Sequence, residues 1–201
     1  MAEEIKMLER AFYERDTRIV AFELIGKMLT FEENGLLLSG RIVETEAYLG
    51  NQDPASHAYR GPTPRNRVMF GPPGTSYVYF TYGNHHCLNV VTEKEGRAGA
   101  VLIRAAEPLS GISTMMKRRG PVSKEALTNG PGKLTQAFGI TRKHSGLEMV
   151  RPPLYITDSE DGKTVSQPPA RIQAAKRIGI SRAKEKLFRF YLAGNPFVSV
   201  K

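Results

Sequence analysis

A predicted β-hairpin in the middle of the chain most constrains the fold. Residues 77–80 and 88–91 are both β-rich, and they flank a short turn around Gly83. Two strands joined by so short a connection must run antiparallel. Further strands are expected at residues 41–48, 100–104, 154–156, 189–192 and 197–200, and Glu107-Pro108 is expected to end the second of these. The pattern therefore favours a sheet that is mainly antiparallel.

Short helices are predicted on either side of these strands. Apolar residues at helical spacing between Leu8 and Met28 predict two helices, and the Asp16-Thr17 pair is expected to cap the second. The chain becomes helical and basic after Gly111. A further short helix is expected over residues 133–138, after a turn rich in Gly and Pro.

Two polar segments, residues 51–74 and 159–169, are predicted to be long loops, which in compact domains are often functional. No repeat, linker or low-complexity tract divides the chain. Its 201 residues suffice for one domain with a sizeable core. We therefore expect a mixed α/β (α+β) fold, a single compact domain over residues 1–201 with a mainly antiparallel curved sheet flanked by short helices.

The charge of the chain favours a polyanionic partner. Lys and Arg number 29 against 20 Asp and Glu, which gives a net charge of +9. Each phosphate that meets a Lys or Arg releases condensed counterions, so this excess suits nucleic acid. A basic surface without a partner is the alternative.

Cysteine and histidine usage favours a protein without a metal or other cofactor. Cys87 is the only cysteine, so it forms neither an intramolecular disulfide nor a Cys-based zinc site. His85 and His86 would point to opposite faces of a strand, and no His/Asp/Glu spacing resembles a known metal site. No secretory signal and no apolar run of about 18 residues is present, so we expect a cytoplasmic protein, nucleoid-associated in a bacterial cell, with no membrane partner.

The strand predicted at residues 41–48 carries candidate catalytic groups. Its two-residue alternation places Glu44, Glu46 and Tyr48 on one face. A carboxylate beside an aromatic ring in a partly dry site can serve as a general base towards water. Arg104, in an otherwise apolar strand, needs an acid or a ligand, and Glu46 on a neighbouring strand is the natural candidate. The alternative is that the acids lie on the solvent face of an edge strand.

Aromatic residues cluster around the predicted hairpin. Tyr77 and Tyr79 share one face of a strand, and Tyr82 is expected at the tip, before Gly83. On a basic protein, an exposed aromatic at such a tip is a candidate wedge between stacked bases. A core aromatic stripe is the alternative, and it suits Tyr77 better than Tyr82.

Three other polar residues stand out. Asn89 interrupts an apolar strand, as Arg104 does. Arg65 and Arg67 lie in the long loop, where they offer donors to phosphates or belong to a solvated surface.

A series of motifs occurs in order along most of the chain. They lie at residues 41–48, 63–67, 74–83, 87–90, 102–109, 129–134, 177–180 and 189–196. One such motif is weak, but together, at this spacing, they resemble the alkyladenine DNA glycosylase family, also called the 3-methyladenine DNA glycosylases. The resemblance implies the family's one-domain α/β fold, which differs from the helix-hairpin-helix glycosylase fold.

The resemblance implies a role for each matched pocket position. Glu46 matches the general base that activates the attacking water, and Arg104 matches the arginine that helps to hold this water. Asn89 matches the side chain that disfavours normal guanine by crowding its amino group. The wall around the flipped base matches Tyr48, His57 and Tyr79.

The resemblance and the charge together imply contacts with DNA. Tyr82 matches the residue that fills the space left in the duplex. His85 stands where mammalian members carry tyrosine, so the groove beside the wedge departs from the family pattern. Basic segments at residues 117–119 and 171–177 are expected to grip phosphates. Contacts with DNA are expected from Arg65, Arg67, Lys133, Arg177 and Asn195.

The implied activity is that of a base-excision repair glycosylase acting as a monomer on double-stranded DNA that contains damaged purines. The candidate bases are 3-methyladenine, 7-methylguanine, hypoxanthine and ethenoadenine. No lysine occupies a matched catalytic position, so water is the expected nucleophile and no strand cleavage is expected. The main alternative is a non-catalytic protein that binds distorted DNA or structured RNA. A transferase acting on RNA is a second alternative, but the chain has no Asn/His/Asp transfer motif.

Overall fold

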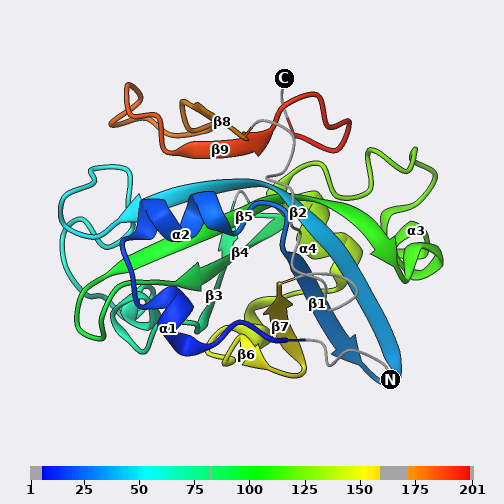
Figure 1. Cartoon of the computed structure of the whole chain (residues 1–201), viewed down its shortest axis with the longest axis horizontal. Helices are drawn as coiled ribbons and strands as arrows, with labels where there is room; N and C mark the ends of the chain where they lie inside the picture. Colours follow the sequence, from blue (N-terminus) through cyan, green and yellow to red (C-terminus); the bar gives the residue numbers. More distant parts are fainter. Residues whose placement is uncertain (1–5, 82, 159–171, 200–201) are drawn as a thin grey trace.

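One antiparallel sheet organises the molecule (Figure 1). A computed structural model describes residues 6–81, 83–158 and 172–199. The strand order is β3-β4-β5-β2-β1-β7-β6, and the β8–β9 pair attaches to β2. The strands in the described ranges are β1 Met28–Glu33, β2 Leu36–Leu49, β3 Ser76–Thr81, β4 His85–Val91, β5 Gly99–Ser110, β6 Val150–Arg151, β7 Leu154–Thr157, β8 Ile172–Ala175 and β9 Arg189–Leu192.

Short helices flank the sheet. They are α1 Arg10–Tyr13, α2 Thr17–Glu23, α3 Ile112–Arg119 and α4 Pro131–Phe138, with 3-10 turns η1 Arg67–Phe70 and η2 Arg142–His144. The Thr45 hydroxyl of β2 donates to the Ala21 carbonyl, which ties α2 to the sheet. The Thr135 hydroxyl of α4 donates to the His86 carbonyl of β4. The mixed α/β fold with its antiparallel sheet is therefore confirmed. None of the helices described here is long and apolar enough to cross a membrane.

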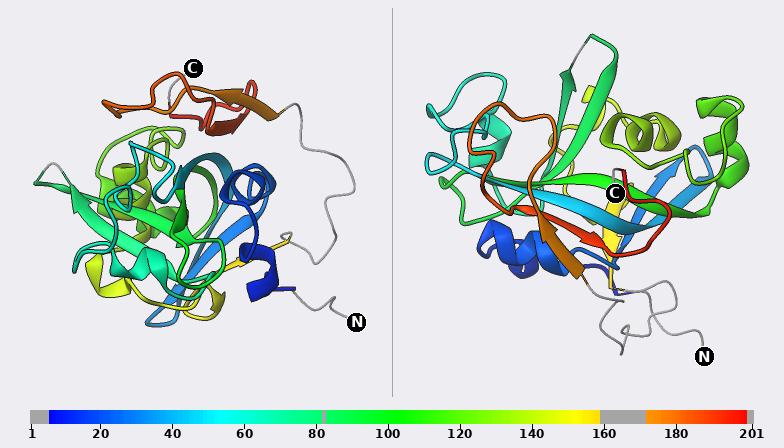
Figure 2. Two further views of the ribbon diagram at one scale, coloured as in Figure 1. Left: turned by 90° about the vertical axis from the view of Figure 1, so that its left-hand side faces the viewer. Right: turned by 90° about the horizontal axis from the view of Figure 1, so that it is seen from above.

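The long strand β2 changes neighbours along its length, and this curves the sheet. Residues 36–41 pair with β1, whereas residues 44–46 pair with β9 on that same side of the strand. On its other side β2 pairs with β5, with irregular register around Glu44. Such irregularities bend a strand and increase its twist. The β3–β4 hairpin projects from the body of the molecule, and β8 and β9 cover one side (Figure 2).

Several predicted elements agree with the structure. The Asp16 side chain accepts from the Arg18 N–H, so it caps α2 as expected. The central hairpin is present as β3 and β4, and the predicted strand at 41–48 lies within β2. The polar loop expected at residues 159–169 lies outside the described residues.

Four predictions are corrected. Met28 begins β1 instead of ending a helix, and Asn34-Gly35, both with positive φ, make the tight turn into β2. Strand β5 continues to Ser110, because Pro108 lies at a register irregularity where its missing N–H is tolerated. β8 lies in a segment predicted only as basic.

The fourth correction concerns the strand predicted at residues 197–200. Residues 197–199 form no strand, and position 200 lies outside the described residues. The Phe197 N–H donates to the Asn195 side chain, and the Ser199 N–H donates to Glu44. Side chains therefore take the backbone donors that a strand would need.

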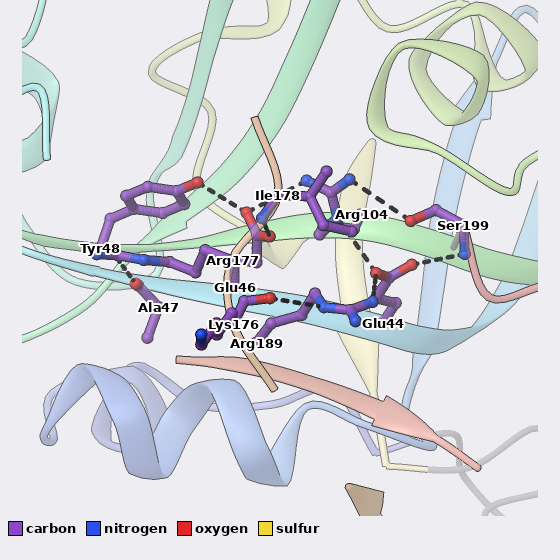
Figure 3. Close-up of polar contacts among 10 residues, drawn as sticks. All are labelled: Glu44, Glu46, Ala47, Tyr48, Arg104, Lys176, Arg177, Ile178, Arg189 and Ser199. Atoms are coloured by element: carbon purple, nitrogen blue, oxygen red, sulfur yellow. Dashed lines mark hydrogen bonds and ion pairs between the residues drawn. The ribbon is translucent and has the colours of Figure 1, made fainter. Parts of the chain in front are cut away.

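A buried ion network joins three strands at the centre of the sheet (Figure 3). The carboxylate of Glu44 on β2 is fully buried. Its Oε1 lies 2.8 Å from Arg189 Nη1 of β9 and 3.3 Å from Arg104 Nε of β5. Its Oε2 accepts from the Ser199 N–H at 2.8 Å. One carboxylate thus links β2, β5, β9 and the segment around residue 199.

We predict that Glu44→Gln lowers the free energy of unfolding by about 3–5 kcal/mol, because it removes a buried negative charge that Arg104 and Arg189 share. Urea denaturation measures this loss. Glu148→Gln is the matched control, since Glu148 also pairs with two arginines, Arg10 and Arg151, but is 37 % exposed. The control should lose no more than about 1 kcal/mol. Equal losses in the two variants would contradict the network's role.

Candidate active site

Glu46 sits at the centre of a converging set of hydrogen-bond donors. Its side chain is fully buried on β2. Oε1 accepts from the Ile178 backbone N–H at 2.7 Å, and Oε2 accepts from the Tyr48 hydroxyl at 2.7 Å (Figure 3). Arg104 Nη1 lies 3.2 Å from Oε2. The expected proximity of Glu46 to Tyr48 and Arg104 is therefore confirmed.

Opposing effects set the protonation of this carboxyl. Burial is the largest, and it raises the pKa of Glu46 above the ordinary 4.5. The Arg104 charge, the Ile178 N–H and the Tyr48 hydroxyl act in the other direction, and Glu44 adds to the rise. Burial and the neighbouring carboxylate raise the pKa of Tyr48, which stays protonated and donates to Glu46.

A cavity of about 740 Å³ opens beside this group. Tyr48, Arg104 and Ile178 line it, whereas Glu46 lies directly behind these three partners. Pockets of about 300–1,000 Å³ are usual for small ligands. The cavity can therefore bring a ligand up to the groups that hold Glu46.

Aromatic rings form one wall of the cavity. The ring of His57 lies 4.6 Å from that of Tyr79, and its Nδ1 is 3.0 Å from the Tyr77 hydroxyl. Burial lowers the pKa of His57, which keeps the imidazole neutral near pH 7. The guanidinium of Arg65 lies 5.7 Å from the centre of the Tyr79 ring. The sequence-predicted pocket residues Tyr48, His57 and Tyr79 thus all line one cavity.

Asn89 lines this cavity from β4 and is held rigidly. Its Nδ2 donates to the Tyr77 carbonyl at 3.0 Å, and the residue is buried. A buried amide with a fixed orientation can accept or exclude a particular ligand edge.

The residues predicted to contact DNA differ in exposure and in their partners. Arg65, Arg67 and Lys133 are exposed, although Lys133 Nζ also donates to Asn129 at 2.8 Å. Asn195 lies in the turn after β9, where its side chain accepts from the Phe197 N–H. Tyr82 lies outside the described residues, as does Arg171.

The structure corrects the expected role of Arg177 in phosphate binding. The side chain is 0 % exposed, and its guanidinium makes two bonds to Asp53, of 2.5 and 2.7 Å. A phosphate on the surface has no access to it. The sequence did not indicate a partner for Arg177. Asp53 lies 124 residues away, in a polar loop where no local pattern distinguishes it from the other polar residues.

Sequence reasoning also missed the Ile178 N–H, since a backbone donor has no side-chain signature. Within the described ranges, no three His, Cys, Asp or Glu side chains lie close enough together to form a metal site. The donors around Glu46 come instead from protein N–H and O–H groups and from Arg104.

Comparison with known proteins gives a consistent family. The model of the methylpurine-DNA glycosylase family matches residues 11–196. A relative from Carboxydothermus hydrogenoformans is 52 % identical over 97 % of this chain and 100 % of its own length. Relatives from Chlorobaculum tepidum (47 % identical, 97 % of this chain and 91 % of the relative) and Methanoculleus marisnigri (48 %, 96 % and 98 %) are similarly close. All three are provisionally named 3-methyladenine DNA glycosylases. The chain therefore belongs to the methylpurine-DNA glycosylase family, the family that its sequence motifs resemble.

Proposed function

We propose that this protein removes alkylated or deaminated purines from duplex DNA by hydrolysing the N-glycosidic bond with water activated by Glu46. The observation that carries the proposal is a buried carboxylate, held by Tyr48, Arg104 and the Ile178 N–H, directly behind an aromatic-walled cavity. Family membership supports the choice of a damaged purine as the substrate.

The cavity fits a base that has been turned out of the helix. A base in a duplex hides its glycosidic bond, so it must be extruded, at a cost of about a few kcal/mol. Tyr48, His57 and Tyr79 would then surround it. An alkylated purine carries positive charge, and aromatic faces attract cations by about 0.5–2 kcal/mol. The candidate bases are 3-methyladenine, 7-methylguanine, hypoxanthine and ethenoadenine, and Asn89 would disfavour guanine.

The chemical step is a displacement at the sugar. The water oxygen bonds to C1′ while the bond from C1′ to the purine nitrogen breaks, and the departing base takes the electron pair. Glu46 accepts a proton from the water, and its negative charge stabilises the positive charge that develops on the sugar. Arg104 orients the water and favours the ionised form of Glu46.

The remaining assignments complete the proposal. The chain acts as a single domain over residues 1–201 and as a monomer, in the cytoplasm where its DNA lies. Tyr82 fills the gap left by the extruded base. DNA contacts come from Arg65, Arg67, Lys133 and Asn195.

We predict that Glu46→Gln reduces the single-turnover rate of base release from methylated duplex DNA by about 10²- to 10⁴-fold, because the amide cannot take the proton. Its affinity for the duplex should stay within a few-fold of wild type. The control Glu148→Gln changes a partly exposed carboxyl that also forms an ion pair, and it should keep the wild-type rate. If wild type releases no base from any damaged duplex yet binds it, the protein is the non-catalytic binder of distorted DNA instead.

We predict that base release falls on the acid side at a pH above 4.5, because burial raises the pKa of Glu46 and only the ionised form accepts a proton. The rate is therefore full above the raised pKa and is lost as the pH falls through it. The measurement uses 7-methylguanine in DNA, whose charge is permanent, and subtracts spontaneous depurination. Tyr48→Phe removes a donor that lowers this pKa, so its acid limb should lie at still higher pH. A wild-type rate that stays flat down to pH 4.5 would contradict the role of Glu46.

We predict no strand cleavage and no covalent DNA adduct after borohydride treatment. No lysine of the described residues lines the cavity, so none of them is placed there to form a Schiff base with the sugar. A glycosylase with lyase activity serves as the positive control. An adduct trapped with this chain would show a covalent mechanism, and Lys133→Ala would then test its source.

A further inference from the structure

Arg177 and Asp53 form a buried ion pair, and their chain neighbours Ile178 and Pro54 line the cavity. Both side chains are 0 % exposed. Asp53 also accepts from the Leu49 N–H at the end of β2 and from the Ala55 N–H, each at 3.2 Å. The pair therefore joins the end of β2, the polar loop after it and the segment that carries Arg177.

The same arginine is linked to two of the three groups that hold Glu46, to Tyr48 through its side chain and to Ile178 through the backbone. Its guanidinium carbon lies 4.7 Å from the centre of the Tyr48 ring, and its Nη1 donates to the Ala47 carbonyl at 2.9 Å. The next residue, Ile178, supplies the N–H to Glu46 Oε1. Figure 3 shows Arg177 and Ile178 on one segment that passes beside Glu46 and Tyr48. Arg177 is thus connected to both the Tyr48 hydroxyl and the Ile178 N–H, which donate to the Glu46 carboxylate.

The energetic cost of the arrangement points to a role beyond stability. Arg177 Nε is buried without a hydrogen-bond partner among the described residues. Buried ion pairs are often no more stabilising than apolar side chains of similar volume. An apolar side chain, however, cannot bind Asp53 through two bonds while it stacks on Tyr48. The planar, charged guanidinium of Arg177 instead fixes the position of the Tyr48 ring relative to Asp53.

We propose that Arg177, locked by Asp53, is a positioning residue for the glycosylase reaction. It holds the Tyr48 ring and the Ile178 N–H against Glu46, so that the carboxylate faces the reacting water in one orientation. This inference rests on the proposed function of Glu46. It replaces the phosphate contact that the basic sequence around residue 177 suggests.

The test separates positioning from DNA binding in Arg177→Met, which keeps much of the side-chain volume. Single-turnover base release is measured with enzyme in saturating excess over a 7-methylguanine duplex. Affinity for an undamaged duplex is measured at several salt concentrations. We expect the rate to fall by about 10- to 100-fold, because small misplacements of supporting groups cost this much. Affinity and its salt dependence should match wild type, since the side chain is buried.

Two more variants separate positioning from a general loss of stability. Asp53→Asn should reproduce the rate loss of Arg177→Met, and Arg177→Lys should recover part of the rate because it restores one bond to Asp53. The control Lys27→Met removes a partly buried ion pair with Asp158, whose two residues do not line the cavity. It should lower the Tm but keep the wild-type rate at temperatures well below the melt. If Arg177→Met does not fold, Asp53→Asn and Arg177→Lys decide the question by the same measurements.

Each outcome has one meaning. A wild-type rate in Arg177→Met or Asp53→Asn overturns the positioning role but leaves the proposed function intact. If Arg177→Met binds the duplex more weakly, with a smaller salt dependence and an unchanged saturating rate, then Arg177 contacts phosphate. This result also overturns the positioning role. A wild-type protein that releases no base overturns the proposed function itself, whatever the variants do.

Discussion

The cost of burying charge governs the structure around the cavity. An isolated ionised group in a protein interior costs several kcal/mol, so each one needs a partner. Here Glu44 lies between Arg104 and Arg189, Glu46 faces Arg104, and Asp53 faces Arg177. Arg104 is shared, and it connects the carboxylate that binds the sheet together to the carboxylate beside the cavity. The guanidinium of Arg104 therefore both stabilises the sheet, through Glu44, and holds Glu46 beside the cavity.

The curvature of β2 makes this arrangement possible. Its first part pairs with β1, and its middle part, where the acids lie, pairs with β9. The irregular register against β5 falls at Glu44. As a result, Glu44 and Glu46 share one face of a strand but have different neighbours. Glu44 is enclosed by strands, and Glu46 lies behind the lining of the cavity.

Local patterns in the sequence predicted much of the fold and part of the site. Asp16 marks a cap, and the alternation of Glu46 and Tyr48 marks a shared face, because both signals lie within a few residues. The Asn34-Gly35 turn is equally local, but no turn is predicted there from the sequence. Arg177 could not be interpreted in this way. Its charge suggested DNA, and only its distant partner Asp53 and its burial, both set by tertiary structure, show otherwise.

The bond between Glu44 and Arg189 spans 145 residues of chain, and this has a consequence for biosynthesis. The ribosome releases β2 long before β9, so during translation the central carboxylate waits without one of its two arginines. Non-local pairings of this kind form late and slowly. A nascent chain that ends before residue 189 lacks Arg189 and the Ser199 N–H, both of which bind Glu44 in the folded protein. The network around Glu44 is therefore complete only once the chain up to Ser199 has emerged, whereas the described partners of Glu46 all lie at or before residue 178.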